Sequence, residues 1–144
     1  MIRIIAVGRL KDARLAAAVD EYARRIRGLG ALEMLEVRDE GPEREAEAML
    51  RRLGSPAGHG LVIALDERGE ALTSRQFAAL LGGHGDVAFL VGGPDGLGET
   101  ARRRAARTLQ LSALTLPHEL ARLVLVEQVY RGLTILRGHA YHRD

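Results

Sequence analysis

Short apolar segments alternate with helix-like segments along this chain, and this alternation constrains the fold more than any other feature. Two of the apolar runs, Leu61–Leu65 and Val87–Val91, are hydrophobic at every position, as in strands that are buried on both faces. The segments between the apolar runs carry hydrophobic residues at helical spacing. This order predicts an α/β fold in which helices sandwich a parallel sheet.

The pattern is specific enough to predict individual elements. Asp12 is expected to cap the first helix, Gly28 to end it, and Thr73 or Ser74 to cap the third helix. Turns are expected at Gly41-Pro42 and Gly54-Ser55-Pro56. The expected strands are Ile2–Val7, Leu32–Val37, Leu61–Leu65, Val87–Val91 and Leu109–Leu111. The other expected helices span Glu43–Leu53, Glu99–Arg107 and Pro117–Gly138.

Length and composition indicate one domain that covers residues 1–144. Hydrophobic residues make up 47% of the chain, yet no run approaches the roughly 18 apolar residues of a membrane span. Cysteine is absent, which excludes disulfides and thiol nucleophiles. Met1–Leu10 has no signal-peptide layout. We therefore expect a cytoplasmic protein that is not bound to a membrane.

The last predicted helix is hydrophobic on nearly every side. Such a helix must be covered all round, and one layer of helices on a chain of this size covers it poorly. We expect a second copy of the chain to supply the cover, with deep burial inside the monomer as the alternative. The apolar residues are Leu120, Leu123, Val124, Leu125, Val126, Val129, Tyr130, Leu133, Ile135 and Leu136.

Charge is distributed unevenly along the chain. Residues 1–30 and 98–144 are basic, and their clusters include Arg24/Arg25 and Arg102/Arg103. This distribution permits a polyanionic partner without requiring one. The segment 38–59 is acidic through Asp39, Glu40, Glu43, Glu45 and Glu47.

Two segments follow strands of the predicted sheet at its carboxyl edge, where parallel sheets bind ligands. Gly92-Gly93-Pro94-Asp95-Gly96 suits either a plain turn or a loop whose backbone approaches a ligand. Leu111–His118 suits either the wall of a nucleobase site or the lead into a helix. The chain has neither a dinucleotide-binding glycine motif nor a P-loop.

The histidines offer little metal chemistry. His59, His84, His118, His139 and His142 lack the spacing of zinc ligands, and we expect no metal site. The tail is more suggestive, because Tyr141-His142-Arg143 combines an aromatic ring, a group that titrates near neutrality and a permanent cation. A frayed chain end is the other interpretation of these residues.

Together, Leu90–Leu97, Leu111–His118 and the terminal Tyr141–Arg143 resemble one family, in the same order and at the same spacing. It is the RlmH (YbeA-like) family of SPOUT-superfamily methyltransferases. The resemblance implies methyl transfer from S-adenosyl-L-methionine (AdoMet) to N3 of a pseudouridine in 23S rRNA, in the helix 69 region of assembled ribosomes. It also implies a homodimer and a carboxyl-terminal trefoil knot, an exception to the rule against knots.

The resemblance also implies the site residues. Tyr141 would stack on or orient the target base, His142 would act as base, and Arg143 would stabilise the developing anion, with His118 as the reserve base. The cofactor loops would contain Leu65, Gly92, Leu111, Ser112, Ala113, Leu114, Thr115 and Leu116.

Two other functions remain open at this point. One is a SPOUT methyltransferase that acts on tRNA, and the other is a non-catalytic AdoMet- or nucleotide-binding module that docks on the ribosome. The acidic segment 38–59 looks shorter than in relatives of this family, which places its contact with RNA in doubt.

Overall fold

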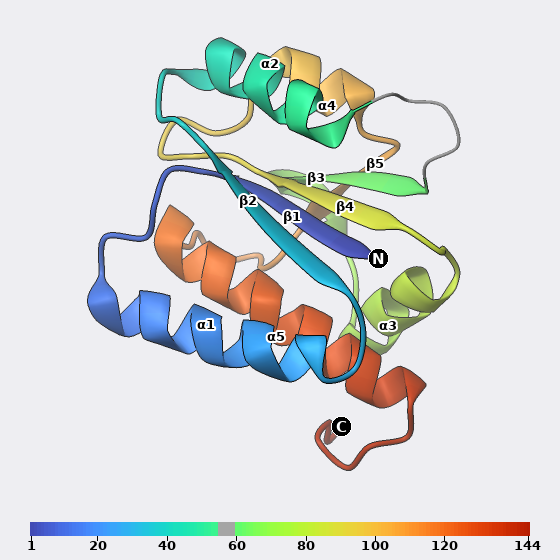
Figure 1. Cartoon of the computed structure of the whole chain (residues 1–144). Coiled ribbons are helices and arrows are strands. Elements are labelled where there is room, and N and C mark those ends of the chain that lie inside the picture. Colours follow the sequence, from blue (N-terminus) through green and yellow to red (C-terminus); the bar gives the residue numbers. More distant parts are fainter. Residues whose placement is uncertain (55–59) are drawn as a thin grey trace.

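The computed structural model describes residues 1–54 and 60–144, and its centre is a five-stranded sheet with the order β2-β1-β4-β3-β5 (Figure 1). All neighbouring strands are parallel. The predicted turn residues Ser55 and Pro56, and also His59, lie outside the described residues. The strands are β1 (Ile2–Val7), β2 (Leu32–Val37), β3 (Leu61–Ala71), β4 (Val87–Val91) and β5 (Arg107–Gln110). The helices are α1 (Ala13–Arg27), α2 (Pro42–Leu53), α3 (Ser74–Gly82), α4 (Glu99–Arg104) and α5 (His118–Leu136).

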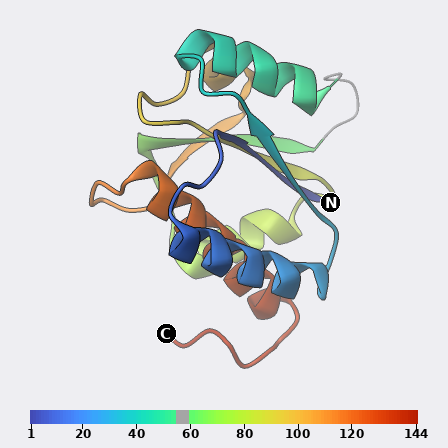
Figure 2. The same ribbon diagram turned by 60° about the vertical axis from the view of Figure 1, so that its left-hand side comes forward.

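Helices cover both faces of the sheet, as predicted. Helices α1, α3 and α5 lie on one face, and α2 and α4 lie on the other (Figures 1 and 2). Each face has its own hydrophobic cluster, one around Phe89 and Ile63 and the other around Leu90 and Met49. The all-apolar strand β4 is buried at every position, which explains its continuous hydrophobic run.

Local capping chemistry determines several helix boundaries. The Asp12 carboxylate accepts hydrogen bonds from the backbone N–H groups of Arg14 and Leu15, and Gly28 ends α1. Thr73 caps α3 and forms a reciprocal capping box with Gln76. The predicted caps at Asp12 and Thr73 are therefore confirmed.

Strand β3 continues beyond Leu65, where the sequence predicts its end. Leu65 and Glu70 both lie opposite Leu109 of β5, so residues 66–69 are looped out of the ladder as a bulge. Gly69 is required there, since a Cβ at this position would lie 2.5 Å from the Leu109 carbonyl carbon. The polar sequence after Leu65 concealed the second half of the strand.

Helix α4 ends at Arg104, three residues before its predicted end at Arg107. Arg107 instead begins β5, opposite Ile63, and its guanidinium pairs with Glu70 of β3 at 2.7 Å. Tertiary pairing with β3 thus overrides the helix propensity of the arginine-rich segment.

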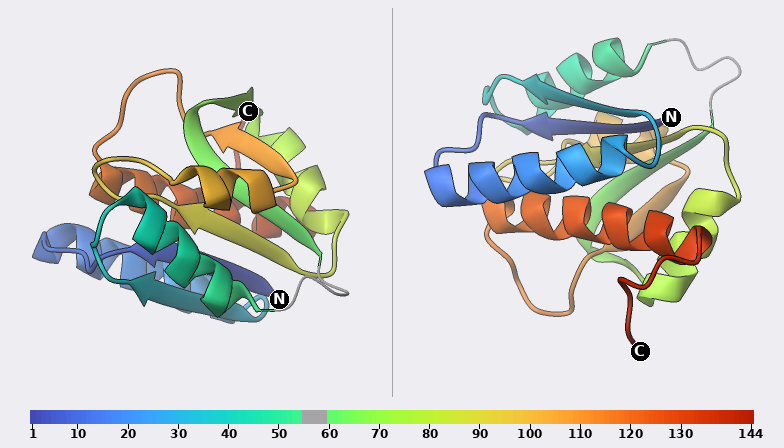
Figure 3. Two further views of the ribbon diagram at one scale, coloured as in Figure 1. Left: turned by 90° about the horizontal axis from the view of Figure 1, so that it is seen from above. Right: turned by 60° about the horizontal axis from the view of Figure 1, so that its bottom comes forward.

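Helix α5 packs between α1 and α3 against the sheet (Figure 3). The chain itself fully buries Leu125, Val126 and Val129. The outer side of α5 also carries a polar stripe, Glu127 and Arg131, which the carboxyl-terminal tail contacts. A single chain therefore covers more of the surface of α5 than we expected from the hydrophobic sequence of this helix.

None of the helices in residues 1–54 and 60–144 combines the length and hydrophobicity that a membrane span requires. The threading of the carboxyl-terminal segment through a knot stays a prediction.

A buried arginine fastens α5 to the carboxyl end of β1. Arg122 is 4% exposed, and its guanidinium donates hydrogen bonds to the carbonyl oxygens of Val7 and Gly8 and to the Glu36 carboxylate. Its Nε has no partner among the described residues. Because a buried cation depends on such partners, this contact fixes where α5 begins relative to the sheet.

We predict that Arg122→Met lowers the free energy of unfolding by about 2–4 kcal/mol, because two carbonyl groups and a carboxylate lose a charged donor. Urea unfolding followed by circular dichroism measures the change. Arg103→Met, on the exposed side of α4, serves as the control and should change stability by less than about 0.5 kcal/mol. Equal stability of the two variants would contradict the role of Arg122.

Candidate functional site

A cavity of about 670 Å³ opens at the carboxyl edge of the sheet. Its walls come from the bulge of β3, the loop after β4, the segment between β5 and α5, and the start of α5. In parallel sheets the carboxyl edge is where ligands bind. The volume lies in the range of sites for small organic cofactors.

The predicted cofactor loops meet at this cavity. Leu65, Gly92, Leu111, Ser112, Leu114, Thr115 and Leu116 line it, and Ala113 does not. The structure therefore brings together three segments that lie far apart in the sequence. Their contact with a cofactor stays a prediction.

The glycine loop after β4 is folded too tightly for side chains. The Gly96 N–H donates a hydrogen bond to the Gly93 carbonyl at 3.0 Å, and Gly96 has a φ of +81°. A Cβ on Gly92 would lie 2.6 Å from the carbonyl carbon of Gly96. The two interpretations of this segment, a plain turn and a loop that approaches a ligand, are thus compatible, because the turn exposes its backbone at the cavity.

The segment between β5 and α5 forms a largely apolar part of the wall (orange loop in Figure 2). The Ser112 hydroxyl accepts a hydrogen bond from the Leu114 N–H at 2.9 Å, which bends the segment. Leu114 is 78% exposed. His118, the reserve base, lines the same cavity at the start of α5.

An ion pair lies in the cavity wall. Arg102 Nη2 lies 2.8 Å from Asp66 Oδ2, and Arg102 Nε donates to the Leu97 carbonyl at 3.2 Å. The sequence placed Arg102 in a basic cluster that permits a polyanionic partner, and the structure adds that Arg102 lines the cavity. Sequence reasoning missed Asp66, although it directly follows Leu65 in the first predicted cofactor loop.

The predicted catalytic tail does not reach this cavity within one chain. Tyr141, His142 and Arg143 follow the far end of α5 (Figure 3), and α5 has 19 residues. A helix of that length extends about 28 Å. The predicted cofactor loops and the tail therefore lie at opposite ends of α5.

The tail is folded back onto α5 through Tyr141. Its hydroxyl donates to Glu127 Oε1 at 3.0 Å and forms a hydrogen bond of 3.0 Å with the Tyr22 hydroxyl. Burial raises the pKa of Tyr141, and the hydrogen bond with Tyr22 adds to the shift. The phenol consequently stays protonated at physiological pH and acts as a donor.

Hydrogen bonds determine which nitrogen of His142 carries the proton. Arg131 Nη1 lies 3.0 Å from Nδ1, and because arginine is only a donor, Nδ1 must be the acceptor. Nε2 then donates to Asp144 at 2.9 Å. Arg75, and to a smaller extent His142, lower the pKa of Asp144 to about 2. Arg143 is exposed.

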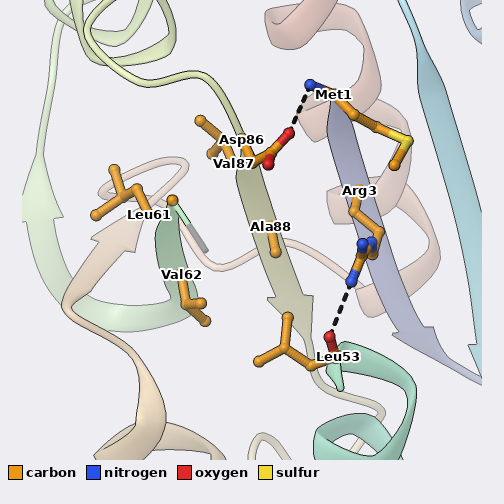
Figure 4. Close-up of a pocket in the computed structure, with 9 residues that line it drawn as sticks. Met1, Arg3, Leu53, Leu61, Val62, Asp86, Val87 and Ala88 are labelled. Carbon is orange, nitrogen blue, oxygen red and sulfur yellow. Dashed lines mark hydrogen bonds and ion pairs between the residues drawn. The ribbon is translucent and has the colours of Figure 1, made fainter. Parts of the chain in front are cut away.

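A small pocket of about 30 Å³ lies at the opposite edge of the sheet (Figure 4). The Met1 ammonium pairs with Asp86 there at 2.9 Å, and Arg3 donates to the Leu53 carbonyl. This volume suits about one water molecule. Within residues 1–54 and 60–144, no group of three or more histidine and carboxylate side chains is placed to hold a metal ion.

Two carboxylates of the acidic segment serve structural roles that the sequence did not reveal. Glu43 accepts hydrogen bonds from the Glu99 N–H and the Thr100 hydroxyl, and so caps α4. Glu45 is 4% exposed and accepts from the N–H groups of Glu40 and Gly41. Loss of hydration on burial raises the pKa of Glu45.

The raised pKa of Glu45 has a defined effect on stability. A carboxyl group whose pKa is higher in the folded state favours folding when it is protonated, so its contribution is lost as pH rises from its unfolded pKa, about 4.3, through the folded value. Relative to the original chain, we predict that Glu45→Gln becomes progressively more stable across this window. Urea unfolding at several pH values measures the difference.

The control for this comparison is Glu47→Gln, on the exposed side of α2. Its stability difference from the original chain should stay nearly constant with pH. If Glu45→Gln behaved in the same way, Glu45 would already be ionised at no cost in the folded protein.

Comparison with known proteins places these features in a family. The model described as "Predicted SPOUT methyltransferase" matches residues 1–142, and the chain belongs to the SPOUT methyltransferase family.

Individual relatives match along nearly the whole chain. Two proteins named "Ribosomal RNA large subunit methyltransferase H" are 45% identical (Anaeromyxobacter sp. strain Fw109-5) and 47% identical (Prochlorococcus marinus strain MIT 9303). The matches cover 99% of this chain and 99% of the first protein, and 98% of this chain and 91% of the second.

A solved structure shares the fold. It is described as "a probable methylase family protein" from Haemophilus influenzae Rd KW20, and the TM-score is 0.56 at 15% identity. The match covers 95% of this chain and 66% of that protein.

Proposed function

We propose that this chain uses AdoMet to methylate the RNA of the large ribosomal subunit. The observation that carries the proposal is the convergence of three loops on one cavity, in a chain matched end to end by relatives named for this activity. The finer proposal is that the acceptor is N3 of a pseudouridine in the helix 69 region of 23S rRNA, on assembled ribosomes in the cytoplasm.

The residues of the cavity suit AdoMet. The segment Leu111–Leu116 offers apolar side chains and backbone groups for a flat adenine, and Gly92 leaves backbone free to approach the ligand. Asp66 and Arg102 supply one charge of each sign. When bound, AdoMet supplies an electrophilic methyl group.

The tail residues would prepare the acceptor. N3 of a pseudouridine carries a proton at neutral pH, so it is a weak nucleophile until that proton leaves. His142 would accept the proton at Nδ1 after its hydrogen bond with Arg131 breaks. Arg143, which is exposed, would stabilise the negative charge, and Tyr141 would orient the base.

Joining the two halves of the site requires a homodimer. Because the tail lies at the far end of α5 from the cavity, the second subunit would provide the tail for each cofactor site. Leu120 and Val124 of α5 are only half-buried, and so is Leu123, which packs against the core. Leu114 and Leu136 are 78% and 46% exposed near the two ends of the helix. A twofold interface across α5 would cover these side chains.

The substrate is tested with labelled AdoMet and three acceptors from a strain that lacks the activity. The acceptors are assembled ribosomes, free 23S rRNA and tRNA. We expect label on a pseudouridine of the ribosomes. Label on tRNA alone would show a tRNA methyltransferase, and AdoMet binding without any transfer would show a non-catalytic module.

If each site combines the cavity of one subunit with the tail of the other, two inactive variants should restore each other's activity in a mixed dimer. Gly92→Ala strains the cofactor loop, and the double substitution His142→Ala with Arg143→Ala removes the tail chemistry. Each variant alone should be inactive. Subunits mixed by unfolding and refolding should regain about a quarter of the original activity, because half of the dimers are mixed and each has one intact site. Absence of recovery in dimers shown to be mixed would place both halves of the site in one subunit.

A further inference from the structure

We propose that the ion pair of Asp66 and Arg102 binds the amino-acid end of the cofactor, its α-ammonium and α-carboxylate groups. This inference rests on the proposed function. It assigns a binding role to Asp66, which the sequence did not single out, and to Arg102, which the sequence placed only in a basic cluster.

The fold brings the two residues together from separate elements. Asp66 is the first residue of the β3 bulge, and Arg102 lies on α4. Both line the cavity, and their nearest side-chain atoms are 2.8 Å apart. The Asp66 side chain is 9% exposed and that of Arg102 is 31% exposed, so the pair is shielded from bulk water but reachable from the cavity.

Each partner has further hydrogen-bonding capacity. The described hydrogen bonds and ion pair of Arg102 use Nε and Nη2, and a guanidinium has five N–H groups, so it can also donate to a carboxylate. Asp66 Oδ1 accepts from the Arg68 N–H at 2.8 Å, and each carboxylate oxygen has two acceptor sites. The pair can therefore bind a ligand that places a positive group beside Asp66 and a negative group beside Arg102.

The amino-acid end of AdoMet provides such charges. Its ammonium group matches Asp66, and its carboxylate matches Arg102 in the forked geometry that arginine favours. The adenine has no charge and fits the apolar segment after β5. A shielded ion pair contributes little net stability by itself, so its placement at the cavity favours a binding role over a purely structural one.

Two ligands that differ in this part of the molecule test the proposal. S-adenosylhomocysteine contains the amino-acid end, whereas 5′-methylthioadenosine contains only the nucleoside and a thiomethyl group. We expect isothermal titration calorimetry to show tighter binding of S-adenosylhomocysteine to the original chain. Arg102→Gln and Asp66→Asn should each weaken that binding about 10- to 100-fold and change the affinity for 5′-methylthioadenosine by less than about twofold.

Further measurements separate recognition from folding. Arg103→Gln, the exposed neighbour on α4, is the matched control and should bind both ligands like the original chain. Decarboxylated AdoMet, which keeps the ammonium group, should bind Arg102→Gln and the original chain with similar affinity.

Defined results would overturn the proposal. An equal loss of affinity for both adenosine ligands would show that the pair only holds the loops together. Equal affinity of the original chain for the two ligands would also overturn it, without using any variant. If the original chain bound neither ligand, the AdoMet-dependent function itself would fall and this inference with it.

Discussion

Parallel pairing of all five strands is the constraint on which the rest of the structure depends. It places every strand's carboxyl end at one edge and requires each connection to cross a face of the sheet. The segments that follow Val91 of β4 and Gln110 of β5 form one cavity together with the bulge after Leu65 of β3. Arg122 then fixes α5 to the carboxyl end of β1 and thereby places His118 beside that cavity.

Sequence patterns predict the elements well where hydrophobic periodicity decides the structure. The bounds of β1, β2 and β4 agree with the expected strands residue by residue. The predicted bounds are wrong where pairing between strands that are distant in the sequence determines the structure. Because β5 pairs with β3, Arg107 belongs to β5 and not to the expected helix, and β3 continues past the polar residues after Leu65. Neither event has a signal in a local window of sequence.

The candidate site, too, was predictable from the sequence only in part. The resemblance named the loops that line the cavity and the residues of the tail, but it could not place the two relative to each other within one chain. The polar contacts in and near the cavity could not be predicted from the sequence. Asp66 and Arg102 are 36 positions apart and pair only because a bulge turns one toward a helix that carries the other. The carboxylates of Glu43 and Glu45 likewise stabilise the fold, although the sequence shows them only as members of the acidic segment 38–59.

The folded-back tail has a consequence for recognition. The side chains of Tyr141, His142 and Asp144 are held by hydrogen bonds to helices α1, α3 and α5. Most of the conformational freedom of the chain end is thus lost when the protein folds. Under the proposed function, an acceptor nucleotide would therefore meet a pre-organised surface, and a weak, transient encounter with a large RNA would not have to order a flexible peptide as well.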